Sequence, residues 1–302
     1  MQNATLYLLT SLIWGSTWLA IKYQLGSVDP EISVAYRFAL AAAILLVYSR
    51  LRGLPLRFSL RDHLYIGLQG LTLFSLNYIL VYLAELYLTS GLVAIAFSLI
   101  IVFNVFLAAL LLRNPILPRV LLGAVVGMAG LALVFRHELT GLAVSGERGL
   151  GLLLAVAGTA VASVGNIVAA RNQRQALPIV QTNAIGMAYG ALITLGVALL
   201  RGAKPGFEAS FAYVASLLYL AAFGSVIAFG GYLTLLGRIG PDRAAYISLV
   251  FPIVALILST LFEGLRWGPE AILGVLFVVA GNAIALTRRR RPVPVESLSS
   301  AS

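Results

Sequence analysis

The chain has 302 residues, of which 60% are hydrophobic and only 11% are charged, and its mean hydropathy is +0.97. So few polar side chains cannot cover the surface of a water-soluble protein of this size, which excludes a soluble enzyme. The formal net charge is +10, but the basic residues lie between apolar runs rather than in one patch, so we expect no nucleic-acid partner. Because there is no cysteine and both histidines lie outside the apolar runs, we expect no metal site and no cofactor.

The apolar runs are long enough to be membrane helices. A helix that crosses about 30 Å of hydrocarbon needs roughly 20 apolar residues, and lipid leaves no backbone group unsatisfied. The first run lacks a basic leader and a small-residue cleavage site, so we expect a retained helix rather than a signal peptide. Counts of nine or eleven spans stay open, because the third and fourth runs nearly fuse. We predict an all-α polytopic membrane protein with ten transmembrane helices, at residues 5–23, 32–51, 64–84, 91–112, 117–135, 150–170, 179–200, 211–232, 244–262 and 271–287.

Basic residues are distributed unevenly over the loops between these runs. One alternate set of loops, together with the C-terminal segment, holds fourteen lysines and arginines, and the opposite set holds six. Because basic residues near span ends are retained in the cytoplasm, we expect both termini there. Eight of the eleven acidic residues, Glu85 and Glu263 among them, fall on the opposite side. The scarcity of lysine beside arginine hints at a GC-rich bacterial genome and a cytoplasmic membrane.

The two halves of the sequence are weakly similar to each other. An offset of 150 residues aligns Gly15 with Gly165, Ala94 with Ala244 and Ser98 with Ser248, and one more residue aligns Gly123 with Gly274. Residues 1–136 and 149–290 therefore form two five-helix repeats, followed by a short disordered cytoplasmic tail at 291–302. An odd number of spans inserts the second repeat upside down, and such inverted-topology repeats are typical of transport by alternating access.

Several short motifs occur in order along the chain: Trp14-Gly15-Ser16 with Lys22, Tyr36-Arg37-Phe38, Ser248-Leu249-Val250-Phe251-Pro252, and Glu263-Gly264 followed by Gly274 and Ala280-Gly281. Together they resemble the drug/metabolite transporter superfamily and, within it, the EamA-type exporters. The chain departs from that pattern at Val102, Arg113-Asn114 and Val164, where proline, Gly-Glu and tryptophan are usual. The resemblance is closest to the YddG-type exporters, which implies export of aromatic and other neutral amino acids.

Polar and aromatic residues inside the spans are candidates for a substrate pathway, since lipid-facing positions should be plain aliphatic. Such residues would form a neutral cavity that stacks a planar side chain and binds a zwitterion through hydroxyls and amides. The alternative is that they only join neighbouring helices, each contact being worth about 0.6 to 2 kcal/mol. The candidate lining residues are Trp14, Trp18, Asn77, Tyr78, Tyr82, Ser98, Asn166, Tyr246 and Ser248.

Charged residues and a proline in the spans are weighed separately. Arg37 and Lys22 are either structural charges, with Glu31 or Glu85 as partners for Arg37, or attractors for a substrate carboxylate. No Asp, Glu or His is expected in the middle of a span, so we predict transport without a buried carboxylate relay. Pro252 removes one helical hydrogen bond in the ninth span, and we expect a gating bend there.

These features favour a secondary transporter of small organic solutes, most plausibly neutral and aromatic amino acids, moved across the lipid bilayer. A nucleotide-sugar or phosphorylated-metabolite carrier is the rival within transport, although it would need more inward-facing Lys or Arg. An intramembrane enzyme is the alternative of another class. We expect no enzyme, because the sequence carries no H-E-x-x-H, G-x-S-x-G or Walker A motif and no paired mid-span Asp. The oligomeric state stays open.

Overall fold

The computed structural model describes residues 2–112, 118–134, 136, 146–239 and 247–286, and the regular elements in this part are all helical. Tyr246 and the expected tail at 291–302 lie outside the described residues. The helices are α1 (Gln2–Lys22), α2 (Pro30–Leu51), α3 (Leu60–Leu71), η1 (Thr72–Leu76), α4 (Asn77–Ala84), α5 (Ser90–Phe97), α6 (Ile100–Leu112), α7 (Pro118–Val134), α9 (Glu147–Arg174), α10 (Ile179–Leu200), α11 (Phe211–Tyr219), η3 (Leu220–Ile227), α12 (Ala228–Ile239), α14 (Ile247–Phe262) and α15 (Pro269–Leu286).

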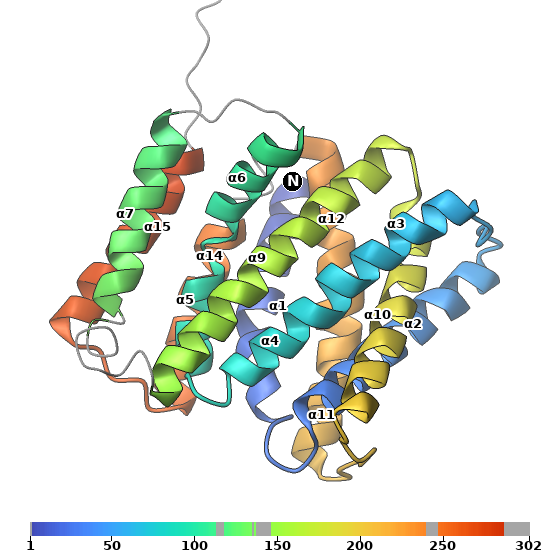
Figure 1. Ribbon diagram of the computed structural model, residues 1–302, viewed down its shortest axis with the longest axis horizontal. Helices are drawn as coiled ribbons and strands as arrows, with labels where there is room; N and C mark the ends of the chain where they lie inside the picture. The colour runs from blue at the N-terminus through green and yellow to red at the C-terminus, as the bar shows by residue number, and fades with distance from the viewer. Residues whose placement is uncertain (1, 113–117, 135, 137–145, 240–246, 287–302) are drawn as a thin grey trace, which may run out of the picture.

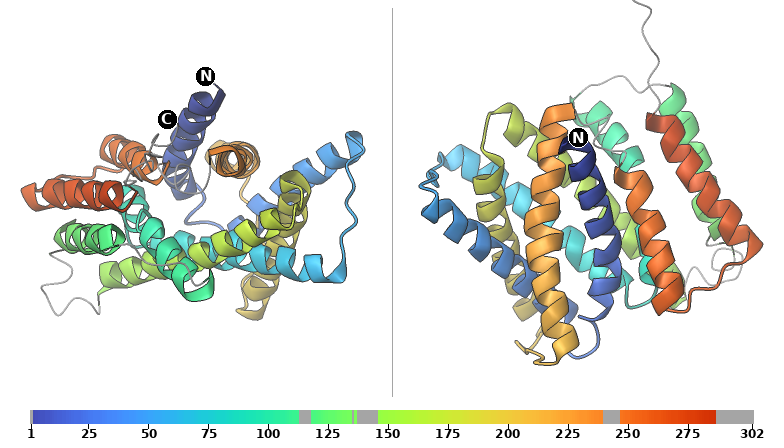
Figure 2. Two further views of the ribbon diagram at one scale, coloured as in Figure 1. Left: turned by 90° about the horizontal axis from the view of Figure 1, so that it is seen from above. Right: turned by 180° about the vertical axis from the view of Figure 1, so that it is seen from behind.

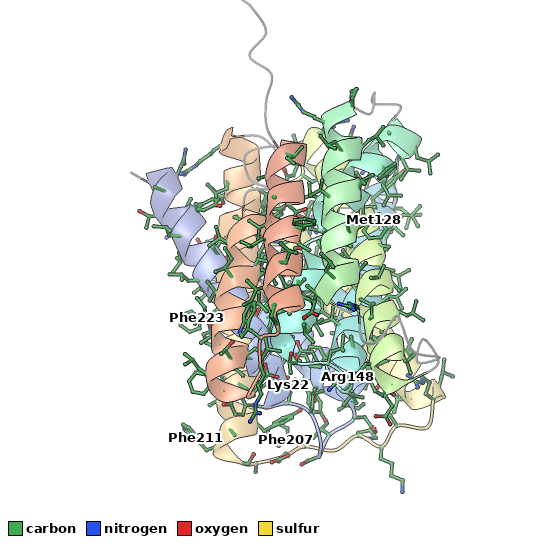
Figure 3. All side chains as sticks on the ribbon, turned by 90° about the vertical axis from the view of Figure 1, so that its left-hand side faces the viewer. Lys22, Met128, Arg148, Phe207, Phe211 and Phe223 are labelled. Atoms are coloured by element: carbon green, nitrogen blue, oxygen red, sulfur yellow. The ribbon has the colours of Figure 1, made fainter. Side chains whose placement is uncertain are left out.

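Many of these helices are long and apolar enough to cross a membrane. Among the described residues, seven helical runs meet both conditions, and three further apolar helices, Pro118–Val134, Val250–Phe262 and Pro269–Ile284, are shorter. Large apolar side chains point outward, for example Met128, Phe211 and Phe223 in Figure 3, as lipid rather than water requires. The prediction of an all-α polytopic membrane protein is confirmed at this level.

The expected spans differ from the observed helices in several places, two of which bear on the cavity. The run predicted at 91–112 is interrupted at Ser98 and Leu99, between α5 and α6. The run predicted at 150–170 is the middle of a longer helix, α9, which has 28 residues. Hydropathy does not detect either feature, because the turn at Ser98 and Leu99 lies within an apolar run and the additional residues of α9 are mostly polar.

The helices form a bundle with the N-terminus at one end (Figure 1). We call the end where α1 begins the N-terminal end and the opposite end, where α1 finishes at Lys22, the far end. On one side of the bundle α1 lies between α12 and α14, as the right-hand view of Figure 2 shows, and on the other side α9 packs against α4 and α6. The crossed pairs α7 with α15 and α2 with α10 stand at the two edges.

Helices of the two halves contact each other reciprocally. At the 150-residue offset, α1 corresponds to α9, α4 to α12, and the α5–α6 run to α14. The contacts of α1 with α12 and α14 thus match the contacts of α9 with α4 and α6. Both halves also contain a π-helical stretch at the same place, η1 and η3, with Ser75 and Ser225 150 residues apart. π-Helical stretches are rare and often occur at functional sites.

Glycines allow α7 and α15 to approach within backbone contact. A Cβ atom on Gly281 would lie 2.5 Å from both the carbonyl oxygen of Gly123 and the amide nitrogen of Gly127. A Cβ atom on Gly130 would likewise lie 2.5 Å from the carbonyl oxygen of Gly274. Because Gly123 aligns with Gly274 in the sequence, and Gly130 with Gly281, the two contacts join aligned positions in reciprocal pairs.

Substitution of one of these glycines should weaken the α7–α15 contact. We expect Gly281→Ala to destabilise the protein by about 1–3 kcal/mol, because an added methyl group must push the two backbones apart. The measurement is thermal unfolding in detergent. Gly196→Ala is the matched control, since a Cβ atom on Gly196 of α10 would meet nothing within 4 Å. Equal melting temperatures for the two variants would contradict the prediction.

Candidate functional site

The centre of the bundle contains a cavity of about 90 Å³, enough for several water molecules or a small organic group. Helices of both halves line it. The lining residues are Trp14, Thr17, Trp18 and Ile21 of α1, Leu73 of η1, Asn77, Tyr78 and Val81 of α4, Phe97 of α5, Ile100 and Asn104 of α6, Ala162 and Asn166 of α9, Phe229 and Tyr232 of α12, and Ser248 and Phe251 of α14. None of these side chains carries a formal charge.

Aromatic rings form much of the cavity wall. The Trp14 ring lies 5.2 Å from the Phe229 ring and 5.1 Å from the Tyr232 ring, measured between centroids. The Trp18 ring stacks on Phe251 at 6.0 Å and contacts Phe97 edge-on at 5.3 Å. Edge-to-face and offset-stacked rings present both faces and edges, so a planar apolar group can pack among them.

Two lining residues carry buried polar atoms without a hydrogen-bond partner: the indole N–H of Trp18 and the side-chain carbonyl oxygen of Asn77. By contrast, the indole N–H of Trp14 donates to the Gly224 carbonyl at 3.2 Å. A buried donor or acceptor without a partner costs about 1–3 kcal/mol, so a ligand that reached these two atoms would be stabilised by the bonds it supplied.

Backbone irregularities bring further acceptors close to the cavity. The ring of Pro252 leaves the Ser248 carbonyl in α14 without its usual helical donor. The corresponding carbonyl of the first half, that of Ser98 at the α5–α6 break, accepts a hydrogen bond from Asn282 at 3.2 Å. The position aligned with Asn282 is Leu131, which cannot donate. The two halves therefore differ at this point, and only Ser248 lies on the cavity wall.

Removal of the proline should slow the conformational change more than it weakens binding. In Pro252→Ala, the new amide N–H can bond to the Ser248 carbonyl and straighten α14, while a second lone pair of that oxygen remains for a ligand. We expect the transport rate to fall several-fold with little change in substrate affinity. Transport rates and binding constants measured in parallel test this, and an unchanged transport rate would argue against a gating bend.

The structure separates the predicted lining residues into two groups. Trp14, Trp18, Asn77, Tyr78, Asn166 and Ser248 do line the cavity. Tyr82 and Ser98 do not: Tyr82 is fully buried and donates to Gln24 Oε1 at 3.3 Å, and the Ser98 hydroxyl donates to the Ile95 carbonyl at 2.7 Å. In this structure the side chains of Tyr82 and Ser98 form hydrogen bonds within the helix bundle, which matches the alternative role left open by the sequence.

Arg37 of α2 is buried beside the cavity rather than in its wall. Its Nε donates to the Ser225 hydroxyl at 3.1 Å, and its guanidinium carbon lies 4.5 Å from the centre of the Tyr78 ring. Glu31, a partner expected from the sequence, instead pairs with Arg201. Tyr78 thus stands between Arg37 and the cavity, and the cation–π contact fixes the orientation of that ring.

Lys22 lies at the far end, in a cluster of charged and polar groups. Its ammonium donates to the main-chain carbonyls of Glu85 and Leu88, the latter at 2.7 Å, and lies 3.8 Å from the Glu263 carboxylate. The Glu263 carboxylate accepts from the Ser90 amide at 3.1 Å and from the Ser90 hydroxyl. In this far-end cluster, Lys22 joins α1 to the α4–α5 loop and to the segment after α14.

The EamA-like transporter family matches residues 3–136 and again residues 149–287. The chain belongs to this family. It is therefore a multi-pass membrane protein and a transporter, as the EamA-type resemblance of its motifs predicted.

Some relatives of this EamA-like transporter are named as uncharacterized transporters, and others carry names that state no function. Protein PagO of Salmonella typhimurium is 25% identical over 295 residues, covering 95% of this chain and 94% of PagO. The uncharacterized inner membrane transporter YedA of Escherichia coli is 29% identical over 252 residues, covering 82% and 79% of the two chains. A solved crystal structure superposes with a TM-score of 0.69 at 20% identity, covering 94% of this chain and 96% of the other. That likeness concerns the fold.

Several lining residues of this EamA-like transporter were missed from its sequence. Phe97, Phe229, Tyr232 and Phe251 supply aromatic rings to the wall. The candidates predicted from the sequence were tryptophan, tyrosine, serine and asparagine residues, and no phenylalanine was among them, although it too is aromatic. Phe229 and Tyr232 are three residues apart on one face of α12, as Trp14 and Trp18 are four apart on α1, and that spacing was the available signal.

Proposed function

We propose that this EamA-like transporter exports small neutral organic solutes, foremost neutral and aromatic amino acids, by alternating access. The observation that carries the proposal is the uncharged, aromatic cavity between the two halves, with an unpartnered donor on Trp18 and an unpartnered acceptor on Asn77. A zwitterion supplies both complements: its carboxylate accepts from the indole N–H, and its ammonium donates to the amide oxygen. The direction, export, rests on the resemblance to the YddG-type exporters.

The proposed mechanism uses ten spans in two inverted repeats. It is supported by the double match to the family, by the reciprocal helix contacts, and by the paired π-helical stretches η1 and η3. Two oppositely inserted halves can exchange conformations, which closes the cavity at one end and opens it at the other. Ile21 and Val81, lining residues near the far end, are only 2% exposed, as expected if this end of the cavity is closed.

We place the protein in the bacterial cytoplasmic membrane with both termini inside. The N-terminal end carries the arginine-rich loops, for example Arg50, Arg52, Arg57 and Arg61, and basic loops are retained in the cytoplasm. The far end, with Lys22, Glu85 and Glu263, then faces the outside. The inner-membrane name of the E. coli relative YedA agrees with this location.

The rival function, a nucleotide-sugar or phosphorylated-metabolite carrier, has less support. A phosphate group is bound by Arg or Lys side chains or by a helix N-terminus. No Lys or Arg is found among the described lining residues, and Arg37 is separated from the cavity by Tyr78. A buried phosphate in this cavity would lack a counter-charge.

An efflux experiment tests the proposal. Proteoliposomes with the purified protein are loaded with labelled neutral, aromatic, acidic and basic amino acids and with a sugar phosphate, and the compounds that leave are recorded. We expect the neutral and aromatic amino acids to leave faster than from protein-free liposomes, and the charged compounds to stay. Selective release of the sugar phosphate would favour the rival, and no release of any amino acid would contradict the proposal.

A further inference from the structure

A second feature of the far end is the burial of the Glu85 side chain. Glu85 directly follows α4 and lies just outside the preceding span, so it does not contradict the prediction that no acid lies in the middle of a span. Its exposed fraction is nevertheless 0%. Neither carboxyl oxygen has a hydrogen-bond partner. The nearby ammonium of Lys22 donates to the main-chain carbonyl of Glu85 and pairs with Glu263 instead.

A carboxyl group in this position is far easier to accommodate in its neutral form. An ionised carboxylate that is removed from water without hydrogen bonds costs several kcal/mol, which protonation avoids. Burial raises the pKa of the Glu85 carboxyl group well above its usual range; Lys22 and Arg37 oppose this effect, and Glu263 adds to it. Tyr82, on the preceding turn of α4, is a further titratable neighbour that interacts with Glu85.

The contacts around Glu85 link its charge to the closure of the far end. Lys22 of α1 reaches the α4–α5 loop and the Glu263 carboxylate, which in turn holds Ser90 at the start of α5. With these bonds formed, the Glu85 carboxyl group is buried and has no contact with water. If Glu85 loses its proton in this arrangement, its charge competes with Glu263 for Lys22 and requires water, and both effects favour separation of α1 from the loop.

We propose that Glu85 is a proton-binding site whose protonation holds the far end closed and whose deprotonation opens it. The inference rests on the proposed function for the statement that the far end faces outside and opens. On opening, the proton passes from the carboxyl group to external water. By linkage, a site that binds the proton more tightly in the closed conformation shifts the population toward closure as the external pH falls, and toward opening as it rises.

Cysteine labelling tests this directly, because the chain has no cysteine of its own. Ile21→Cys reports on opening, since Ile21 lines the cavity near the far end and is only 2% exposed. Leu86→Cys is the reference, since Leu86 lies in the same region and is 48% exposed. A membrane-impermeant maleimide is added outside, and the ratio of the two labelling rates removes the intrinsic pH dependence of the thiol. We expect this ratio to rise roughly tenfold from about pH 5 to about pH 8.

Two variants of Glu85 and one control variant at another acidic residue decide the outcome. In Glu85→Gln, and in the smaller Glu85→Ser should the first variant fail to fold, the ratio should be independent of pH. In Glu270→Gln, which alters an acid paired with Arg136 at the start of α15, the pH dependence should remain. A flat ratio in the parent protein, or the same rise in both Glu85 variants, would overturn the proposal. The assay uses no substrate, so its failure leaves the efflux result untouched, and absent efflux with an intact pH response would contradict only the proposed substrates.

Discussion

Ala162→Phe is expected to abolish transport while the protein remains folded. Ala162 of α9 is 1% exposed and forms part of the cavity wall, so a phenyl ring at this position occupies the space that a substrate needs. We expect the efflux rate to fall by roughly 100-fold or more, which corresponds to about 2.7 kcal/mol added to the barrier. The measurement is efflux from proteoliposomes at equal amounts of inserted protein.

The control for this substitution is Leu153→Phe. Leu153 is on the same helix but 58% exposed, on a surface that faces lipid in our proposal, so the larger ring should be tolerated there. Both variants should have melting temperatures close to that of the parent protein. The ring in Ala162→Phe fills the existing cavity, and the ring in Leu153→Phe contacts lipid. Normal efflux in Ala162→Phe would mean that substrates do not pass through this cavity.

Trp18→Phe is expected to weaken substrate binding without removing the aromatic wall. The substitution keeps a ring beside Phe97 and Phe251 but deletes the unpartnered indole N–H. Loss of a hydrogen bond to a charged group is worth about 1.5–3 kcal/mol, so the dissociation constant for a labelled aromatic amino acid should rise roughly 10- to 100-fold. Equilibrium binding to the purified protein is the measurement.

Trp14→Phe provides the matched comparison. The Trp14 N–H already donates to the Gly224 carbonyl, so its loss should lower stability more than affinity. An analogue that lacks the carboxylate should bind the parent and Trp18→Phe equally, which identifies the group that the indole contacts. If the two tryptophan variants lose the same affinity, only the bulk of the rings matters and the proposed hydrogen bond is wrong.

Much of the fold could be predicted because a membrane imposes a simple pattern. Long apolar runs predicted the helices. Polar and aromatic residues within α1, α4, α9 and α14 predicted six of the residues that line the cavity, Trp14, Trp18, Asn77, Tyr78, Asn166 and Ser248. In these helices the face turned toward the bundle is also the face with polar or aromatic side chains. Periodicity therefore identifies it from the sequence alone.

Other features depend on neighbours that are distant in the sequence. Ser98 is a polar residue within a predicted span, as expected for a lining residue, but its carbonyl accepts a hydrogen bond from Asn282 of α15. No local sequence pattern predicts that contact. Glu85 reads as a loop residue, yet α1 and the loops around it close over it. Burial of a residue near a helix end is decided by packing, which hydropathy does not measure.

The reciprocal packing of the halves has a consequence for biogenesis. Most helices of the first half find their principal neighbours in the second: α1 packs on α14, α2 on α10, α4 on α9, and α7 on α15. A chain that ended after α7 would present those interfaces, with their close-set glycines and buried polar groups, to lipid. Stable assembly thus has to wait until α15 has been synthesised and inserted, and the first helices must persist in the bilayer as loosely associated, chaperone-accessible segments until it arrives.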